Sequence, residues 1–134
     1  MNVLLDSHIL LWALSEDKRL SDKARGIILE PGNTLYYSVV SVWEIAIKHA
    51  LHPDNVRLSG RELSDYCQEA GFLPLALRDK HVYSLETLHR DEDAPRHNDP
   101  FDKILLSQAK IENMSFLTHD PLFQGYHEGC VIFV

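Results

Sequence analysis

Cysteine is scarce in this sequence. Only Cys67 and Cys130 occur, far apart in the chain and outside any CxxC pattern. This spacing argues against a disulfide framework and a zinc site, and it favours buried thiols in a reducing compartment. One long-range disulfide bond between the two residues is the remaining alternative.

Long apolar runs are also absent. The apolar stretch from Val3 to Leu14 is interrupted by Asp6, Ser7 and His8, and Asp6 is the first charged residue. A membrane span needs about 20 apolar residues, and a signal peptide starts with positive charge, so this segment fits neither. We therefore expect a cytoplasmic protein that makes no membrane contact.

Positive charge is in short supply. The chain has 13 lysines and arginines against 20 aspartates and glutamates, which gives a formal net charge of −7. A protein of this charge does not attract nucleic acid through its overall electrostatic field. If the protein handles a polyanion, local features must provide the attraction.

Four common catalytic motifs are missing. The patterns GxSxG, GxxxxGK[ST], GxGxxG and HExxH do not occur. Their absence removes the usual hypotheses of a serine hydrolase, a P-loop enzyme, a dinucleotide-binding enzyme and a zincin protease. The sequence also contains no internal repeat, low-complexity tract or linker.

The composition is that of one folded domain. Of the 134 residues, 45% are hydrophobic and 25% are charged. A domain of this size buries roughly two-thirds of the surface of its unfolded chain, which is enough for a core without metal or disulfide support. We expect a single domain over residues 1–134.

Short strands alternate with helices along the chain. Pro31 and Gly32 end one helical segment, Ser59 and Glu62 have the spacing of a capping box, and Pro100 suits the first position of another helix. The predicted strands are residues 2–5, 34–40, 72–77, 115–118 and 130–134, and the predicted helices are residues 9–14, 20–30, 42–50, 60–70, 79–88 and 101–113. Ser41 and Asp79 are candidate helix caps, and residues 89–99 form a polar loop. This alternation predicts an α/β fold with a mostly parallel sheet covered by helices on both faces.

Acidic residues recur where the predicted strands end. Asp6 follows the first strand, Glu44 lies one helical turn beyond the second, Asp99 and Asp102 begin a late helix, and Asp120 follows the strand at residues 115–118. Ligands of parallel α/β sheets bind beyond the carboxyl ends of the strands. If the strands concerned are neighbours, these carboxylates converge in one place.

Several carboxylates in one cleft repel one another, and a divalent cation removes that cost. Ligands that are all oxygen suit hard ions such as Mg²⁺ or Mn²⁺. Such ions activate water and neutralise charge that develops on a phosphate, so metal-assisted hydrolysis of a phosphodiester is the indicated chemistry.

Each acid also has a purely structural interpretation. Asp6 can cap the helix that follows it, and Glu44 stands three residues after Ser41, as in a capping box. Asp99 and Asp120 each precede a proline, the arrangement of a helix cap followed by proline at the first helical position. Capping does not explain why an acid follows two strands that are expected to be adjacent and buried.

Other candidate residues carry weaker signals. His49 and His52 share a spacing of three residues, but they lack further zinc ligands and fit a polar helix end better. Trp12, Trp43 and Phe101 fit core or interface positions better than base-stacking platforms. Five basic residues could line a path for RNA, although scattered surface charge is the default explanation: Lys48, His49, Arg57, Lys103 and Lys110.

Four segments together resemble a known family. In order along the chain they are LLDSH at residues 4–8, SVWEIAIK at 41–48, HNDPFDKILLSQA at 97–109 and LTHD at 117–120. Each is short, but their order and spacing over nearly the whole chain resemble the PIN-domain ribonucleases, and within these the VapC-like toxins. Lys103 and Ser107 depart from the arginine and alanine that are common at these positions, and neither is expected to touch a metal.

The resemblance implies a three-layer α/β/α sandwich that cuts single-stranded or loop regions of RNA with Mg²⁺ or Mn²⁺. The family's acidic residues correspond to Asp6, Glu44, Asp102 and Asp120, which are expected to bind the metal and carry catalysis, with Asp99 as a secondary candidate. The resemblance also implies a homodimer and a small cognate antitoxin whose C-terminal segment blocks the cleft. The RNA target, the antitoxin and the choice of metal are not indicated.

Three rival functions come from other classes. A response-regulator receiver needs an acid after its third strand, where Arg78 stands, and a lysine after its fifth. A haloacid-dehalogenase-type phosphatase needs a second aspartate two residues after Asp6, where His8 stands. The non-enzymatic alternative is a catalytically inert PIN-like module that binds RNA or protein, and retention of the full acidic set disfavours it.

Helical phase separates Asp102 from Asp99 and yields a first prediction. Asp102 lies on the same helical stripe as Leu105 and Ala109, where an unpaired carboxylate is costly and a metal would remove that cost. Asp99 is placed as the helix cap, a role worth about 1 kcal/mol that asparagine largely fulfils. We expect Asp99→Asn to keep substantial RNA cleavage, and Asp102→Asn to fold normally but lose most metal-dependent cleavage. RNA cleavage and titration calorimetry of the two variants test this ranking. An inactive Asp99→Asn and a nearly normal Asp102→Asn would show that the metal ligand lies one helical turn from Asp102, at Asp99.

Overall fold

The computed structural model describes residues 1–134 and consists of five strands, six α-helices and two 3₁₀ helices. The strands are β1 (Asn2–Leu5), β2 (Thr34–Ser38), β3 (Leu73–Leu75), β4 (Ser115–Thr118) and β5 (Val131–Phe133). The helices are α1 (Ser7–Ser15), α2 (Asp22–Leu29), α3 (Val39–Leu51), α4 (Gly60–Glu69), α5 (Asp79–Tyr83) and α6 (Pro100–Ile111), with 3₁₀ helices η1 (Ser84–Thr87) and η2 (Pro121–Tyr126). No helix combines the length and the apolar character needed to cross a bilayer.

All five strands are parallel and lie in the order β3-β2-β1-β4-β5. The predicted α/β class is therefore confirmed, and the sheet is entirely parallel. The first strand lies at the centre, between β2 and β4. This order makes the carboxyl ends of β1, β2 and β4 neighbours, which is the condition for the predicted convergence of acids.

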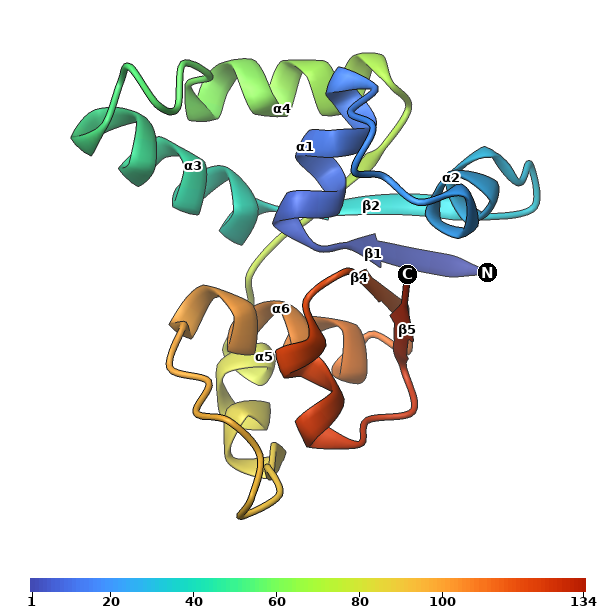
Figure 1. Cartoon of the computed structure of the whole chain (residues 1–134), viewed down its shortest axis with the longest axis vertical. Coiled ribbons are helices and arrows are strands. Elements are labelled where there is room, and N and C mark those ends of the chain that lie inside the picture. The colour runs from blue at the N-terminus through green and yellow to red at the C-terminus, as the bar shows by residue number, and fades with distance from the viewer.

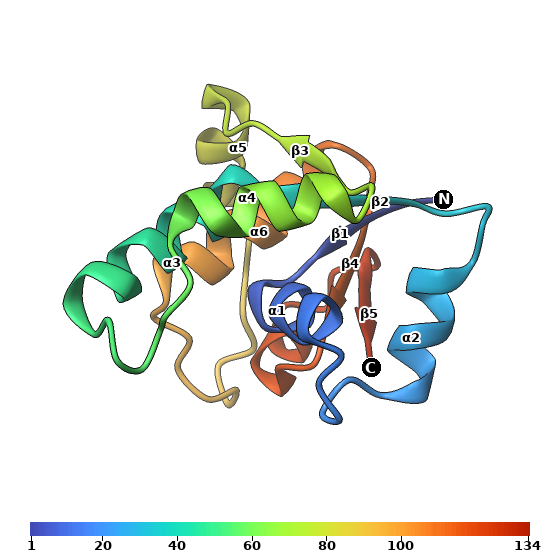
Figure 2. The same ribbon diagram turned by 90° about the horizontal axis from the view of Figure 1, so that it is seen from above.

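Helices cover both faces of the sheet, as a three-layer sandwich requires (Figure 1). Helices α1 to α4 lie on one side, and α5, α6 and η2 lie on the other; Figure 2 shows α1, α2 and α4 over the first face. Side chains alternate between the faces along each strand. The first core contains Val3, Leu5, Leu35, Tyr37 and Leu117, and the second contains Leu4, Phe116, Leu105, Leu106 and Phe123.

The junction between β2 and α3 differs from the prediction. The strand ends at Ser38 rather than residue 40, and Ser38 caps α3 by accepting a 3.0 Å hydrogen bond from the Val40 amide. The Ser38 hydroxyl also donates to Gln108 on α6 at 2.6 Å. Ser41 is therefore a buried residue within α3, and the predicted capping box of Ser41 and Glu44 is wrong.

Three further boundaries are shorter than predicted. Only Leu73–Leu75 pairs within the segment 72–77, since Ala76 turns its carbonyl to the Gln108 amide instead. The helix predicted over residues 79–88 divides into α5 and η1, and its cap is Arg78 rather than Asp79. The last strand is Val131–Phe133, and residues 89–99 contain no helix or strand, as predicted.

Candidate metal centre

A polar cleft of about 270 Å³ lies at the carboxyl end of the central strands. It contains all five acids that the sequence singled out. The lining residues are Asp6, Ser7, His8, Glu44, Lys48, His97, Asn98, Asp99, Asp102, Asp120 and Leu122. Only one of them is hydrophobic, so the cleft is suited to a charged ligand.

Asp6 connects the end of β1 to the start of α1. Its Oδ1 accepts a 2.8 Å hydrogen bond from the Ser7 amide, which makes it the cap of α1, and its Oδ2 accepts a 2.7 Å bond from the Thr118 hydroxyl. Burial raises the pKa of Asp6 to about 6, and the charge of Asp102 adds to this effect. The side chain is therefore held in one orientation but is costly to ionise.

Glu44 is buried on α3 and is held by two side chains. Ser7 donates to its Oε1 at 3.0 Å, and the Lys48 ammonium donates to its Oε2 at 2.7 Å. The Ser7 hydroxyl also lies 2.8 Å from the Ser41 hydroxyl. Because the single Ser7 proton points to Glu44, Ser41 is the donor in that second bond.

Asp99 and Asp102 have different surroundings although both begin α6. Asp99 Oδ1 accepts hydrogen bonds from the amides of Phe101 at 2.9 Å and Asp102 at 3.4 Å, so Asp99 is the helix cap. Asp102 instead contacts His97, whose Nε2 lies 2.9 Å from its Oδ2. Burial raises the pKa of Asp102 to about 7, with contributions from the nearby carboxylates, Asp99 first.

Asp120 follows β4 and begins η2. Its Oδ1 accepts a 2.9 Å hydrogen bond from the Leu122 amide, and its own amide donates to the Thr118 hydroxyl at 3.1 Å. Thr118 therefore links two acids, since its hydroxyl proton goes to Asp6 while its oxygen accepts from Asp120. The sequence analysis gave Thr118 no role, although its place at the end of a central strand is the signal that would have indicated one.

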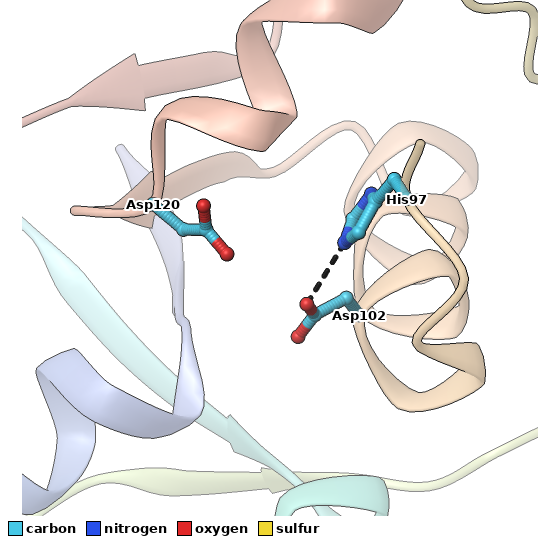
Figure 3. Close-up of side chains that lie close together, drawn as sticks. All are labelled: His97, Asp102 and Asp120. Carbon is cyan, nitrogen blue, oxygen red and sulfur yellow. Dashed lines mark hydrogen bonds and ion pairs between the residues drawn. The ribbon is translucent and has the colours of Figure 1, made fainter. Parts of the chain in front are cut away.

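His97 is a second residue whose role the sequence analysis missed. It was noted only as part of the segment HNDPFDKILLSQA, and its surrounding loop is polar. In the structure it is buried, and its ligand nitrogen lies within 4.8 Å of carboxylate oxygens of Asp102 and Asp120 (Figure 3). Burial lowers the pKa of His97, and the charge of Arg90 has the same effect, so the imidazole is neutral at pH 7.

The donor set of the cleft suits a hard divalent cation. Carboxylates of four separate elements face one space, and Lys48 is the only lysine or arginine that lines it. Two of these carboxyl groups hold their protons at unusually high pH because their charges are buried together. Oxygen donors of this kind match the preferences of Mg²⁺ and Mn²⁺.

The sequence model of the PIN domain family matches residues 3–128. The chain belongs to the PIN domain family. The match spans all five acids of the cleft, from Asp6 to Asp120, so the residues described above lie within the family's domain. Among curated proteins there is no significant match.

Solved structures of PIN-like fold include three toxin-antitoxin complexes. The complex of VapBC2 from Rickettsia felis, bound to a DNA fragment from its promoter, gives a TM-score of 0.70 at 16% identity and covers 100% of this chain and 98% of that chain. VapBC-1 from nontypeable Haemophilus influenzae gives a TM-score of 0.63 at 21% identity and covers 92% of this chain and 91% of that chain. A toxin-antitoxin complex from Klebsiella pneumoniae gives a TM-score of 0.57 at 14% identity and covers 97% of this chain and 95% of that chain. At these identities the likeness establishes a shared fold.

The raised pKa of Asp102 predicts how stability depends on pH without metal. Its pKa of about 7 lies above the ordinary value of 3.8, so between these values the folded protein keeps a proton that the unfolded chain has lost. The contribution of this group to stability is therefore present below about pH 4 and lost as the pH rises through about 7. In EDTA, Asp102→Asn should gain stability relative to wild type as the pH rises from 4 to 8.

Urea unfolding at a series of pH values measures this difference, and Asp54→Asn on the surface is the matched control. Addition of Mn²⁺ at pH 7.5 should stabilise wild type more than Asp102→Asn, because the ion binds the folded state. A difference between wild type and Asp102→Asn that stays constant with pH would contradict the raised pKa.

Proposed function

We propose that this protein is a metal-dependent endoribonuclease and the toxin of a toxin-antitoxin pair. The observation that carries the proposal is the convergence of Asp6, Glu44, Asp102 and Asp120 in one cleft of a PIN domain. Caps alone do not require such convergence, because a helix can be capped by serine or threonine without concentrating negative charge. The most economical reason to gather these acids is a cation that binds them together.

In this proposal Asp6, Glu44, Asp102 and Asp120 hold Mg²⁺ or Mn²⁺. Bound by these residues, such an ion would supply activation of water and compensation of the negative charge on the phosphate. The residues of the chain hold the ligands in place. Thr118 binds the carboxylate of Asp6 and the backbone amide of Asp120, and Ser7, itself bonded to Ser41, binds Glu44. Each of these hydroxyls is buried, so the carboxylates are oriented before a ligand arrives.

Lys48 is the residue we assign to the RNA backbone. Its ammonium pairs with Glu44 at 2.7 Å, yet about half of its side chain is exposed at the cleft. The remaining donors of the ammonium are free to meet a phosphate oxygen. A local cation of this kind allows an acidic protein to bind RNA at the cleft, while its net charge of −7 repels RNA elsewhere.

The assignment as a toxin rests on the three neighbours in fold, which are toxin-antitoxin complexes. We infer a small antitoxin partner from them, and we propose a homodimer, a single domain over residues 1–134 and a cytoplasmic location. The alternative of an inert PIN-like module that binds RNA or protein is disfavoured by the complete set of acids in the cleft.

Metal-dependent cleavage of RNA is the direct test. Purified protein should cut single-stranded RNA with Mg²⁺ or Mn²⁺ and stop when EDTA is added. Asp6→Asn should keep the fold but lower the rate by orders of magnitude, because it removes the charge at the centre of the site while leaving its hydrogen-bonding shape. Asp54→Asn, the same change on the surface, should cleave like wild type. Undiminished cleavage in EDTA would refute the metal mechanism.

Growth of a bacterial host tests the toxin assignment separately. Expression of the wild-type chain alone should arrest growth, and Asp6→Asn should not. A small protein encoded beside it should relieve the arrest and copurify with the chain. Harmless overexpression of a protein that cleaves RNA in vitro would remove the toxin assignment and leave the nuclease assignment intact.

A further inference from the structure

His97 is held on both of its ring nitrogens, although it lies in the longest irregular loop. Its Nδ1 lies 2.8 Å from the Tyr126 hydroxyl, and its Nε2 lies 2.9 Å from Asp102 Oδ2. The side chain is only 1% exposed. A buried imidazole with two hydrogen-bond partners has one orientation, so the loop delivers a fixed group to the cleft.

The partners of His97 determine which nitrogen carries the proton. A carboxylate that binds metal is ionised and can only accept, so the proton must be on Nε2 and point to Asp102 Oδ2. The lone pair of Nδ1 then accepts from the Tyr126 hydroxyl. The result is a directed chain of two hydrogen bonds from Tyr126 through His97 to Asp102.

The ring of His97 is also fixed by packing. Its ring packs edge to face with Phe123, with ring centroids 5.1 Å apart, and its centroid lies 5.5 Å from that of Tyr126. Both aromatic residues belong to η2. Arg90 stacks over Tyr126 at 4.7 Å and donates to the carbonyl oxygens of Leu122 and Pro95. The loop is thereby fastened to η2, the same short helix that begins at Asp120.

We propose that His97 is a positioning residue that holds Asp102 in the orientation needed to bind the metal, and that Tyr126 sets the orientation of His97. The bond from His97 engages Oδ2 and leaves Oδ1 directed away from the imidazole (Figure 3). This inference rests on the metal site of the proposed function. It extends that site from the four acids to a histidine and a tyrosine that follow from the contacts around Asp102.

Direct coordination of the ion by His97 is the competing role. Two observations favour positioning: the Nε2 atom that faces the cleft is already in hydrogen-bond contact with Asp102, and the four acids proposed as ligands all offer oxygen. Hard ions of the Mg²⁺ class prefer such oxygen ligands. In the positioning role His97 acts through Asp102 alone.

Mn²⁺ affinity, measured by calorimetry and by the EPR signal of free Mn²⁺, tests the proposal without RNA. His97→Leu should weaken binding by about 10- to 100-fold, the usual effect of removing a group that orients a metal ligand. His97→Gln, whose amide N–H can reach the place of Nε2, should recover most of that loss. Tyr126→Phe removes only the hydroxyl and should weaken binding a few-fold. His52→Gln, on the exposed end of α3, is the control and should bind Mn²⁺ like wild type.

Epistasis and spectroscopy decide between the two roles. If His97 acts through Asp102, then His97→Leu and Tyr126→Phe should have no further effect on Mn²⁺ affinity in the Asp102→Asn background. Pulsed EPR should show no nitrogen coupling to bound Mn²⁺ that disappears in His97→Gln, and such a coupling would overturn the positioning role by making His97 a ligand. Wild-type affinity in a folded His97→Leu variant would also overturn it, as would a His97→Gln variant as weak as His97→Leu.

The outcome is separable from that of the proposed function. A wild-type protein that binds Mn²⁺ but does not cut RNA would refute the nuclease assignment, and the affinities of the His97 variants would still test the positioning role. A wild-type protein that cuts RNA, with Mn²⁺ affinity indifferent to His97, would refute only the positioning role. Circular dichroism of each variant shows that a loss of affinity is not a loss of fold.

Discussion

The mutual repulsion of carboxylates at the carboxyl edge of the sheet is the constraint on which the rest of this site depends. Burial raises the pKa of both Asp6 and Asp102, and neighbouring carboxylates raise the two values further. Folding brings these charges together, so the protein must either bind protons there or bind a cation. A divalent ion held by these carboxylates would satisfy the constraint at neutral pH.

The fold meets this constraint by giving the acids a structural use as well. The side chains of Asp6, Asp99 and Asp120 each accept a hydrogen bond from a backbone amide at the start of a helix. Amides at a helix start carry partial positive charge, which offsets some of the cost of a buried carboxylate. The capping and the metal-binding interpretations of the sequence are therefore compatible, since one oxygen of a carboxylate can cap a helix while the other faces the cleft. Asp99, which has the most complete capping geometry, is the least suited to be a metal ligand.

The chain belongs to the PIN domain family and folds as a parallel α/β sandwich, and neither fact specifies a substrate for the cleft. The three similar complexes share the fold at 14% to 21% identity, so the likeness concerns the fold alone. Around the acids of this chain lie Lys48 beside Glu44, the Ser7 and Ser41 hydroxyls, and the link from Tyr126 through His97 to Asp102.

Local pattern in the sequence was sufficient for the α/β class, most of the helices and the set of acids, because each depends on neighbours within a few residues. It failed where a distant residue decided the outcome. Ser38 caps α3, in place of Ser41, because its hydroxyl also meets Gln108, 70 residues away. Thr118 was given no role although it ends a central strand, and His97 had no local signal of function; their partners Asp6 and Tyr126 come from other parts of the chain. The sequence determined which acids stand at the ends of strands; only the tertiary structure decided which side chains orient them, because hydrogen bonds between separate elements form when the sheet and its two helical layers come together.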